Sequence, residues 1–159
     1  MRGKRFPRQA IEPDPVYGNR VVSRLINRVM QAGKKTIAQK QVYRALSIAQ
    51  EQTKAEDAME LLRQALDSIK PNMEVHSRRV GGAAYQVPVP VKGDRKEALA
   101  IRWLVVSARN RSSSQFRSFS EKLAAELVDA LKGEGEAVRK RETTQKMADA
   151  NKAFAHFRW

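Results

Sequence analysis

The sequence predicts a mainly α protein, a bundle of about six helices with one β-hairpin that protrudes from it at residues 73–91. Two observations carry this prediction. Apolar residues recur at helical spacing in several separate segments, which is typical of helices that bury one face. Between the third and fourth segments, two runs of β-forming residues flank Gly81-Gly82, and glycine supplies the positive φ angles that a tight reversal needs.

Three helices precede the hairpin. The first begins after Asn19 as N-cap and ends at Ala32-Gly33, and the second follows Lys34-Lys35. The third is expected to open with a capping box from Thr53 to Glu56 and to stop at Lys70-Pro71. One face of the first helix is apolar, and the opposite face is basic through Arg20, Arg24 and Arg28.

The register of the hairpin depends on the length of its loop, because side chains alternate between faces along a strand. A two-residue turn on Gly81-Gly82 sets Val75 opposite Pro88, whereas a three-residue loop that includes Ala83 sets Val75 opposite Val89. The longer loop places the apolar side chains of both strands on one face. We therefore expect three loop residues, with Arg79 opposite Tyr85 as a further consequence.

No further strand is expected beside the hairpin, because Pro88 and Pro90 lack backbone donors on the same edge. An isolated two-stranded ribbon is marginal in water, so it needs the helical body or a partner molecule. Near the tip, Arg78, Arg79 and Tyr85 favour nucleic acid as that partner, since guanidinium groups bind phosphate and both side-chain types stack on bases. Charges that keep an exposed strand edge soluble are the alternative.

Three more helices follow the hairpin. The fourth is predicted to open with a capping box from Asp94 to Glu97, and it is apolar almost all round, which indicates the buried central helix of the bundle. A basic, Ser-rich loop at residues 109–117 leads to the fifth, which closes at Lys132-Gly133. The last helix is weakly apolar and carries Arg139-Lys140-Arg141, a pattern that a nucleic-acid partner fits.

The two ends of the chain differ in composition from the helical domain at residues 19–148. Residues 1–18 form a Pro-rich arm, and such arms order when a polyanion binds or serve as solubilising tails. Residues 149–159 form a basic and aromatic tail. Three roles are open for it: stacking on bases, docking on another protein, or packing back on the body. The basic residues of the arm are Arg2, Lys4, Arg5 and Arg8.

Composition narrows the partner to a polyanion. The 159 residues fit one domain, and 31 Lys plus Arg against 17 Asp plus Glu give a net charge of +14. No apolar run approaches the ~20 residues of a membrane span, and no apolar signal core follows the N-terminus, so we expect a cytoplasmic protein without membrane contact. With no Cys and two His, neither a metal site nor a cofactor is expected.

Three other functions fit the sequence less well. Residues 33–36 superficially resemble a phosphate-binding loop, but its leading glycine would fall at Arg28 and no strand precedes it. A helix-turn-helix DNA-binding regulator fits the short basic helices, although no dimerisation signal is evident. An enzyme is disfavoured because no nucleophile has an evident His base.

Five stretches together resemble bacterial ribosomal protein seven of the small subunit, over nearly the whole chain. They are Pro13-Asp14-Pro15 and residues 33–36, 77–88, 100–103 and 150–159. The resemblance implies a bundle of about six helices with a protruding ribbon, direct binding to the 3′ major domain of small-subunit ribosomal RNA, and nucleation of head assembly. It also implies a position near the messenger exit and the exit-site transfer RNA, beside ribosomal protein eleven of the small subunit.

The resemblance also assigns the contact residues and the location. It implies a place in a cytoplasmic ribosome, although a plastid-encoded relative would have the same features. Some relatives repress their own operon by binding its messenger RNA, and the sequence does not show whether this protein does so. The implied ribosomal RNA contacts are Arg2, Lys4, Arg5, Arg8, Lys34, Lys35, Arg78, Arg79, Arg95, Arg102, Arg109 and Arg111. The residues implied near transfer RNA and messenger are Arg79, Gly81, Gly82, Tyr85, Lys152, Arg158 and Trp159.

Overall fold

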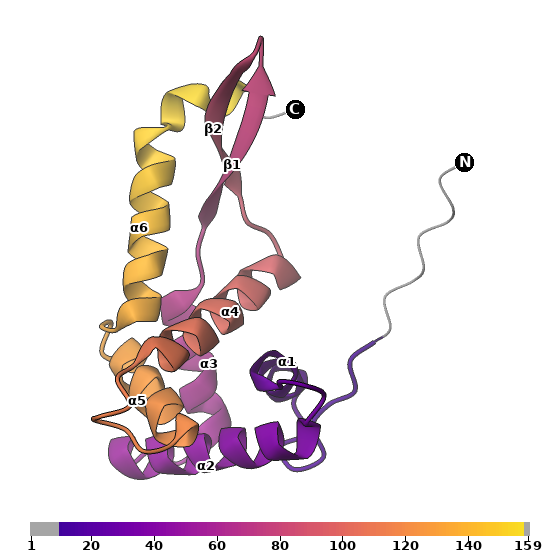
Figure 1. The fold of residues 1–159 in the computed structure, drawn as a ribbon, viewed down its shortest axis with the longest axis vertical. Helices are drawn as coiled ribbons and strands as arrows, with labels where there is room; N and C mark the ends of the chain where they lie inside the picture. The colour runs from indigo at the N-terminus through magenta and orange to yellow at the C-terminus, as the bar shows by residue number, and fades with distance from the viewer. Residues whose placement is uncertain (1–9, 158–159) are drawn as a thin grey trace.

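The computed structural model describes residues 10–157 of the chain (Figure 1). The predicted contact residues at the two ends lie outside the described residues, namely Arg2, Lys4, Arg5, Arg8, Arg158 and Trp159. The described elements are α1 (Arg20–Val29), α2 (Lys35–Thr53), α3 (Ala58–Ile69), β1 (Met73–Val80), β2 (Ala83–Pro90), α4 (Asp94–Asn110), α5 (Phe119–Leu131), α6 (Glu136–Ala150) and the short 3₁₀-helix η1 (Lys152–Phe157). The predicted fold class, a helical bundle with one protruding hairpin, is confirmed.

Helix α4 packs against four other helices, but the prediction that it is buried all round is wrong, because Arg95, Ala98 and Arg102 are exposed along one face. It contacts α1, α3, α5 and α6, and α2 packs along α5 (Figure 1). The side chains of Ala100, Leu104 and Val105 on α4 are completely buried. Burial of a Leu or Val side chain stabilises the folded state by about 1.5–3 kcal/mol, so the apolar stripes of the helices hold the bundle together.

The predicted start of the first helix is confirmed, and that of the third is wrong. Asn19 caps α1, since its side-chain oxygen accepts a hydrogen bond of 2.8 Å from the Val21 N–H. Thr53, predicted to cap the third helix, is the last residue of α2, and its hydroxyl donates to a carbonyl one turn earlier in that helix. The N-cap of α3 is Asp57 instead, because α2 ends only where Lys54 turns to φ 54°.

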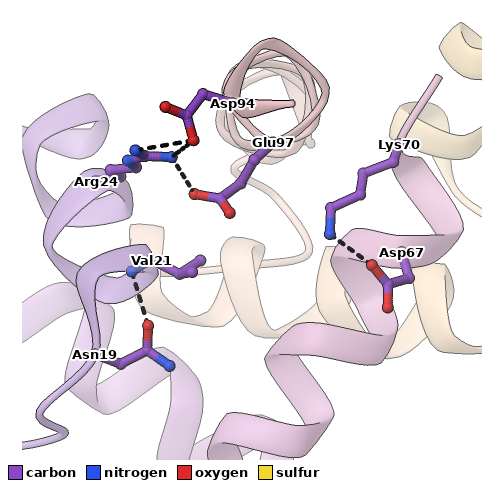
Figure 2. A network of polar contacts seen from close by, with 7 residues as sticks. All are labelled: Asn19, Val21, Arg24, Asp67, Lys70, Asp94 and Glu97. Atoms are coloured by element: carbon purple, nitrogen blue, oxygen red, sulfur yellow. Dashed lines mark hydrogen bonds and ion pairs between the residues drawn. The ribbon is translucent and has the colours of Figure 1, made fainter. Parts of the chain in front are cut away.

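The capping box predicted at the start of the fourth helix is also wrong. The N-cap of α4 is Gly93, with φ 53°, and no side chain caps it. The carboxylates of Asp94 and Glu97 reach Arg24 of α1 instead, across the interface between the two helices (Figure 2). These two carboxylates therefore bind Arg24, from a distant part of the chain, and not the backbone N–H groups at the start of their own helix.

The ribbon has a two-residue turn, so the expected three-residue loop is wrong. Gly81 and Gly82 have φ angles of 59° and 90°, which suit the tight turns whose twist matches that of a hairpin. Val75 pairs with Pro88, and Arg78 rather than Arg79 pairs with Tyr85. The expectation failed because it assumed a single buried face, whereas β2 buries adjacent residues near its base, Val87 and Pro88, on opposite faces.

The helical body supports the ribbon from one side. Helix α6 runs alongside and contacts both strands, and η1 contacts β2 (Figure 1). The ring of Tyr85 lies 5.3 Å from that of Phe154 and 5.2 Å from that of Phe157, measured between ring centroids. The described part of the tail therefore packs back on the ribbon, one of the three outcomes considered for it.

Two findings bear on the expected partners. No helix within residues 10–157 is long and apolar enough to cross a membrane. Over the same residues, no group of three or more His, Cys, Asp or Glu side chains is placed to hold a metal ion.

Candidate nucleic-acid interface

Five arginines line a hollow of about 670 Å³ between α1 and α4. Successive arginines on α1 are spaced four residues apart, so they project from one face of the helix about one turn apart. Ala98 and Ile101 of α4 contribute apolar surface, and Asp94 is the carboxylate among the lining residues. The five arginines that line the hollow are Arg20, Arg24, Arg28, Arg95 and Arg102.

Arg24 connects the two walls of the hollow (Figure 2). Its Nη1 lies 2.7 Å from Glu97 Oε1 and 3.4 Å from Asp94 Oδ1. The hydrogen bond to Glu97 is the main cause of the raised pKa of Arg24, which remains charged. These interactions hold α1 against α4, so Arg24 links the two helices.

Arg95 is paired in a similar way with the base of the ribbon. Its Nε and Nη2 lie 2.6 and 2.8 Å from the two carboxylate oxygens of Glu74 on β1, a bidentate arrangement. This pairing is the main reason why the pKa of Glu74 is lowered, and His76 adds a second hydrogen bond of 2.8 Å. Arg95 thus clamps β1 to the start of α4.

The other three arginines of the hollow are exposed and form no ion pair within the described residues. Arg20, Arg28 and Arg102 are all exposed, and no carboxylate of the described residues lies within ion-pair distance of them. Placed on two helices whose spacing Arg24 fixes, these three guanidinium groups present positive charge to the solvent. Such an arrangement suits the phosphates of a nucleic acid.

A second basic site surrounds the turn between α1 and α2. Lys34 and Lys35 are exposed there, and no side chain caps the start of α2. Arg109, in the last turn of α4, donates a hydrogen bond of 3.0 Å from Nη2 to the carbonyl oxygen of Val29. The structure therefore gathers three predicted contact residues, far apart in sequence, around the end of α1.

Arg111, also predicted to contact RNA, is directed into the protein. Its guanidinium forms ion pairs with Glu126 and Asp129 of α5 and lies 5.7 Å from the ring centroid of Phe116. Glu126 is 1% exposed, and its second oxygen accepts a hydrogen bond of 2.9 Å from the Ala137 N–H at the start of α6. Arg111 thus belongs to a network that joins α5 to α6.

The tip of the ribbon forms a third basic site, at the opposite end of the long axis from α2 (Figure 1). Arg79 is exposed, and its Nε lies 3.4 Å from the carbonyl oxygen of Gly82. Tyr85 contacts the aromatic rings of η1, and Lys152 at the start of η1 is exposed. The tip of the ribbon and Lys152 of the tail, both predicted to lie near transfer RNA, therefore lie at the same end of the molecule.

Comparison with known proteins places the chain in a family. The model of the family "Ribosomal protein S7p/S5e" matches residues 1–152. The chain belongs to this family. Three relatives, all called small ribosomal subunit protein uS7, come from Stenotrophomonas maltophilia (52% identity over 153 residues, 96% of each chain), Nitratiruptor sp. (50% over 159 residues, 100% of each) and Thermotoga maritima (51% over 159 residues, 100% of each).

Membership of the S7p/S5e family confirms the predicted resemblance and decides between the classes of function. The family is ribosomal, belongs to the translation machinery and is structural rather than enzymatic, so the predicted absence of catalysis is confirmed. The alternative of a helix-turn-helix regulator is set aside on the same ground.

Arg20 and Arg28 were not among the predicted contact residues, although they line the hollow as exposed cations. A signal for them was present in the sequence, since the four-residue spacing marks one basic helix face. Sequence reasoning did not reveal that this face lies opposite Arg102 of α4. That juxtaposition depends on the contact between α1 and α4.

Proposed function

We propose that this protein is a constituent of the small ribosomal subunit that binds the 3′ major domain of its ribosomal RNA directly and nucleates assembly of the head. The observation that carries the proposal is the hollow between α1 and α4, where Arg20, Arg28 and Arg102 are exposed and unpaired within the described residues. The ribosomal name of the relatives, all from bacteria, supports it and points to the bacterial cytoplasm.

The mechanism is electrostatic and needs no catalytic group. Guanidinium and ammonium groups cancel the repulsion between phosphates, which lets RNA helices that would otherwise repel one another converge on the protein. The ion pairs of Arg24 and Arg95 hold α1 and β1 against α4, so the exposed arginines keep their positions when RNA phosphates bind them. Because Arg20, Arg28 and Arg102 lie on packed helices, RNA binding has to order their side chains but not the backbone that carries them.

The ribbon and η1 serve a second contact in this proposal. Arg78, Arg79 and Lys152 provide positive charge at the far end of the molecule, where the exit-site transfer RNA and the messenger would pass. Exposed Gly81 and Gly82 allow close approach of a nucleic-acid backbone at the tip. Ribosomal protein eleven of the small subunit is the proposed protein neighbour across the messenger path.

A salt-series binding titration tests the first contact. The protein is titrated with a 3′ major domain fragment of small-subunit ribosomal RNA, with a scrambled RNA of equal length as competitor. The double variant Arg20→Ala with Arg28→Ala should weaken binding and reduce the slope of log affinity against log salt by about 0.7–0.9 for each lost phosphate contact. The matched control is Arg63→Ala, an exposed arginine on α3 that pairs with Glu60.

Two results would contradict the proposal. One is equal affinity for the scrambled RNA, which would leave a basic helical protein without specificity for a ribosomal fold. The other is a double variant that binds the fragment like the Arg63→Ala control, which would show that the hollow between α1 and α4 is not the contact surface.

A further inference from the structure

A recess of about 350 Å³ lies beside the turn between α1 and α2. Its walls come from the end of α1, the start of α2, the end of α4 and the start of α5. Four of the lining side chains are apolar, namely Val29, Ile37, Ala38 and Phe119. Its volume is at the small end of the roughly 300–1,000 Å³ of small-ligand sites, and its lining suits a flat apolar ring better than a phosphate.

Ile37 is the unusual member of this lining. Its side chain is 54% exposed in the first turn of α2, close to the exposed cations Lys34 and Lys35. Phe119 is half-buried and packs against the core, so its ring is held in place on the other side of the recess. A ring that enters the recess therefore meets apolar surface from both α2 and α5.

The recess also has polar side chains in its lining, and hydrogen bonds hold two of them in place; the polar lining residues are Gln31, Lys34, Gln41 and Arg109. The hydrogen bond from Arg109 to the Val29 carbonyl oxygen holds its guanidinium at the wall. Gln41 accepts a hydrogen bond of 3.1 Å from the Ser120 N–H through Oε1, which leaves its Nε2 as the end that can donate to a ligand. Lys34 adds a positive charge, and no Asp or Glu lines the recess.

We propose that this recess binds one unpaired nucleobase of the RNA, with the adjoining phosphates on Lys34 and Arg109. An unpaired base combines a flat apolar face with an edge that carries hydrogen-bond acceptors, and proteins read RNA chiefly through such unstacked bases. Donors at the recess favour guanine, whose O6 and N7 both accept. The inference rests on the proposed function, because it requires RNA to lie across the turn between α1 and α2.

The test compares three variants in the same titration with the 3′ major domain fragment. Ile37→Ala removes apolar contact with the base without removing charge, so affinity should fall about fivefold to tenfold while the salt slope stays unchanged. Lys34→Ala should lower the salt slope by about 0.7–0.9. Met147→Ala is the matched control, since its side chain is similarly exposed, at 47%, but lies on α6.

A second measurement identifies the base. Base-specific chemical modification of the RNA fragment should show one nucleotide that the unaltered protein protects and that becomes reactive with Ile37→Ala, while the backbone protection elsewhere is unchanged. Circular dichroism of each variant should show the helix content of the unaltered protein, so that a lost contact is distinguished from a lost fold.

The outcomes separate the two proposals. If Ile37→Ala behaves like Met147→Ala and no base loses protection, the recess does not hold a base of this RNA. The proposed function survives that result as long as the double variant of α1, Arg20→Ala with Arg28→Ala, still weakens binding. If none of these cationic variants changes affinity, the proposed function fails, and the inference about the recess fails with it.

Discussion

Replacement of Arg111 by Ala should destabilise the fold strongly, although Arg111 lies in a loop. The carboxylate of Glu126 is 1% exposed and receives a hydrogen bond of 2.7 Å from Arg111 Nε. Without Arg111, Glu126 retains the Ala137 N–H as a donor and keeps Asp129 as a neighbour of like charge. Removing one partner of a buried pair leaves the other charge uncompensated, at a cost of about 3–5 kcal/mol.

This loss is measurable by thermal unfolding followed by circular dichroism. One kcal/mol shifts the Tm of a domain of this size by about 2–4 °C, so Arg111→Ala should lower the Tm by roughly 6–20 °C. Adding Glu126→Gln to the same chain should recover part of the loss, because the orphaned charge is removed while the side chain still accepts from Ala137 N–H. The control Arg117→Ala, exposed in the same loop, should cost less than about 0.5 kcal/mol.

Either of two results would refute this reasoning. A loss below about 1 kcal/mol for Arg111→Ala would mean that water reaches Glu126 and compensates its charge. If Arg111→Ala with Glu126→Gln loses as much stability as the two single variants added together, Arg111 and Glu126 act independently. Confirmation would assign Arg111 to the connection between α5 and α6 rather than to RNA.

Three further predictions concern the ribbon and the start of the chain. Arg78→Glu with Arg79→Glu should weaken RNA binding or exit-site function while circular dichroism shows an intact helical body. Tyr43, whose hydroxyl donates a 2.7 Å hydrogen bond to Asp14, has its pKa raised to about 12, chiefly by burial. Ultraviolet titration should show a tyrosine that ionises near pH 12, and the stabilising effect of its protonated form, complete below pH ~10, should be lost as pH rises from there to about 12. Glu74→Gln should speed amide hydrogen exchange at the base of the ribbon, because it removes the carboxylate that Arg95 binds. Since the pKa of Glu74 is lowered in the folded state, the stabilising effect of its carboxylate is present above pH ~4.5 and is lost as pH falls through the pKa of the folded state.

Each of these predictions has a result that contradicts it. Loss of helix content in the ribbon variant would show that its two arginines are structural. A Tyr43 that ionises near pH 10, the ordinary value for tyrosine, would contradict both its burial and its bond to Asp14. Unchanged exchange in Glu74→Gln, compared with Glu60→Gln on the exposed surface of α3, would show that the clamp to α4 contributes nothing.

The sequence alone determined the elements whose signals are local. Apolar spacing located the six helices, because a helix that packs on a core must present one apolar face whatever its neighbours are. Gly81-Gly82 located the turn of the ribbon, because a tight reversal needs positive φ. The net charge of +14 indicated a polyanion, because charge is a sum over residues that folding does not alter.

Local signals failed where another interaction competed for the same side chain or the same face. Thr53 resembled an N-cap, yet α2 continued through it and its hydroxyl bonded within that helix. The acids at the start of α4 resembled a capping box, yet they bind Arg24, some 70 residues earlier in the chain. The hairpin register failed because β2 buries residues on both of its faces near the base, against neighbours that the strand sequence does not specify.

Which cations remain free for RNA was decided only by the tertiary structure. In the sequence, Arg24, Arg28, Arg95, Arg102, Arg109 and Arg111 are equivalent positive charges. Folding pairs Arg24, Arg95 and Arg111 with carboxylates that lie 15 to 73 residues away, and leaves Arg28 and Arg102 exposed across one hollow. Ion pairing acts at distances of a few ångströms, and the packing of the helices sets those distances; composition gives the sign of the partner, and the fold gives the surface that binds it.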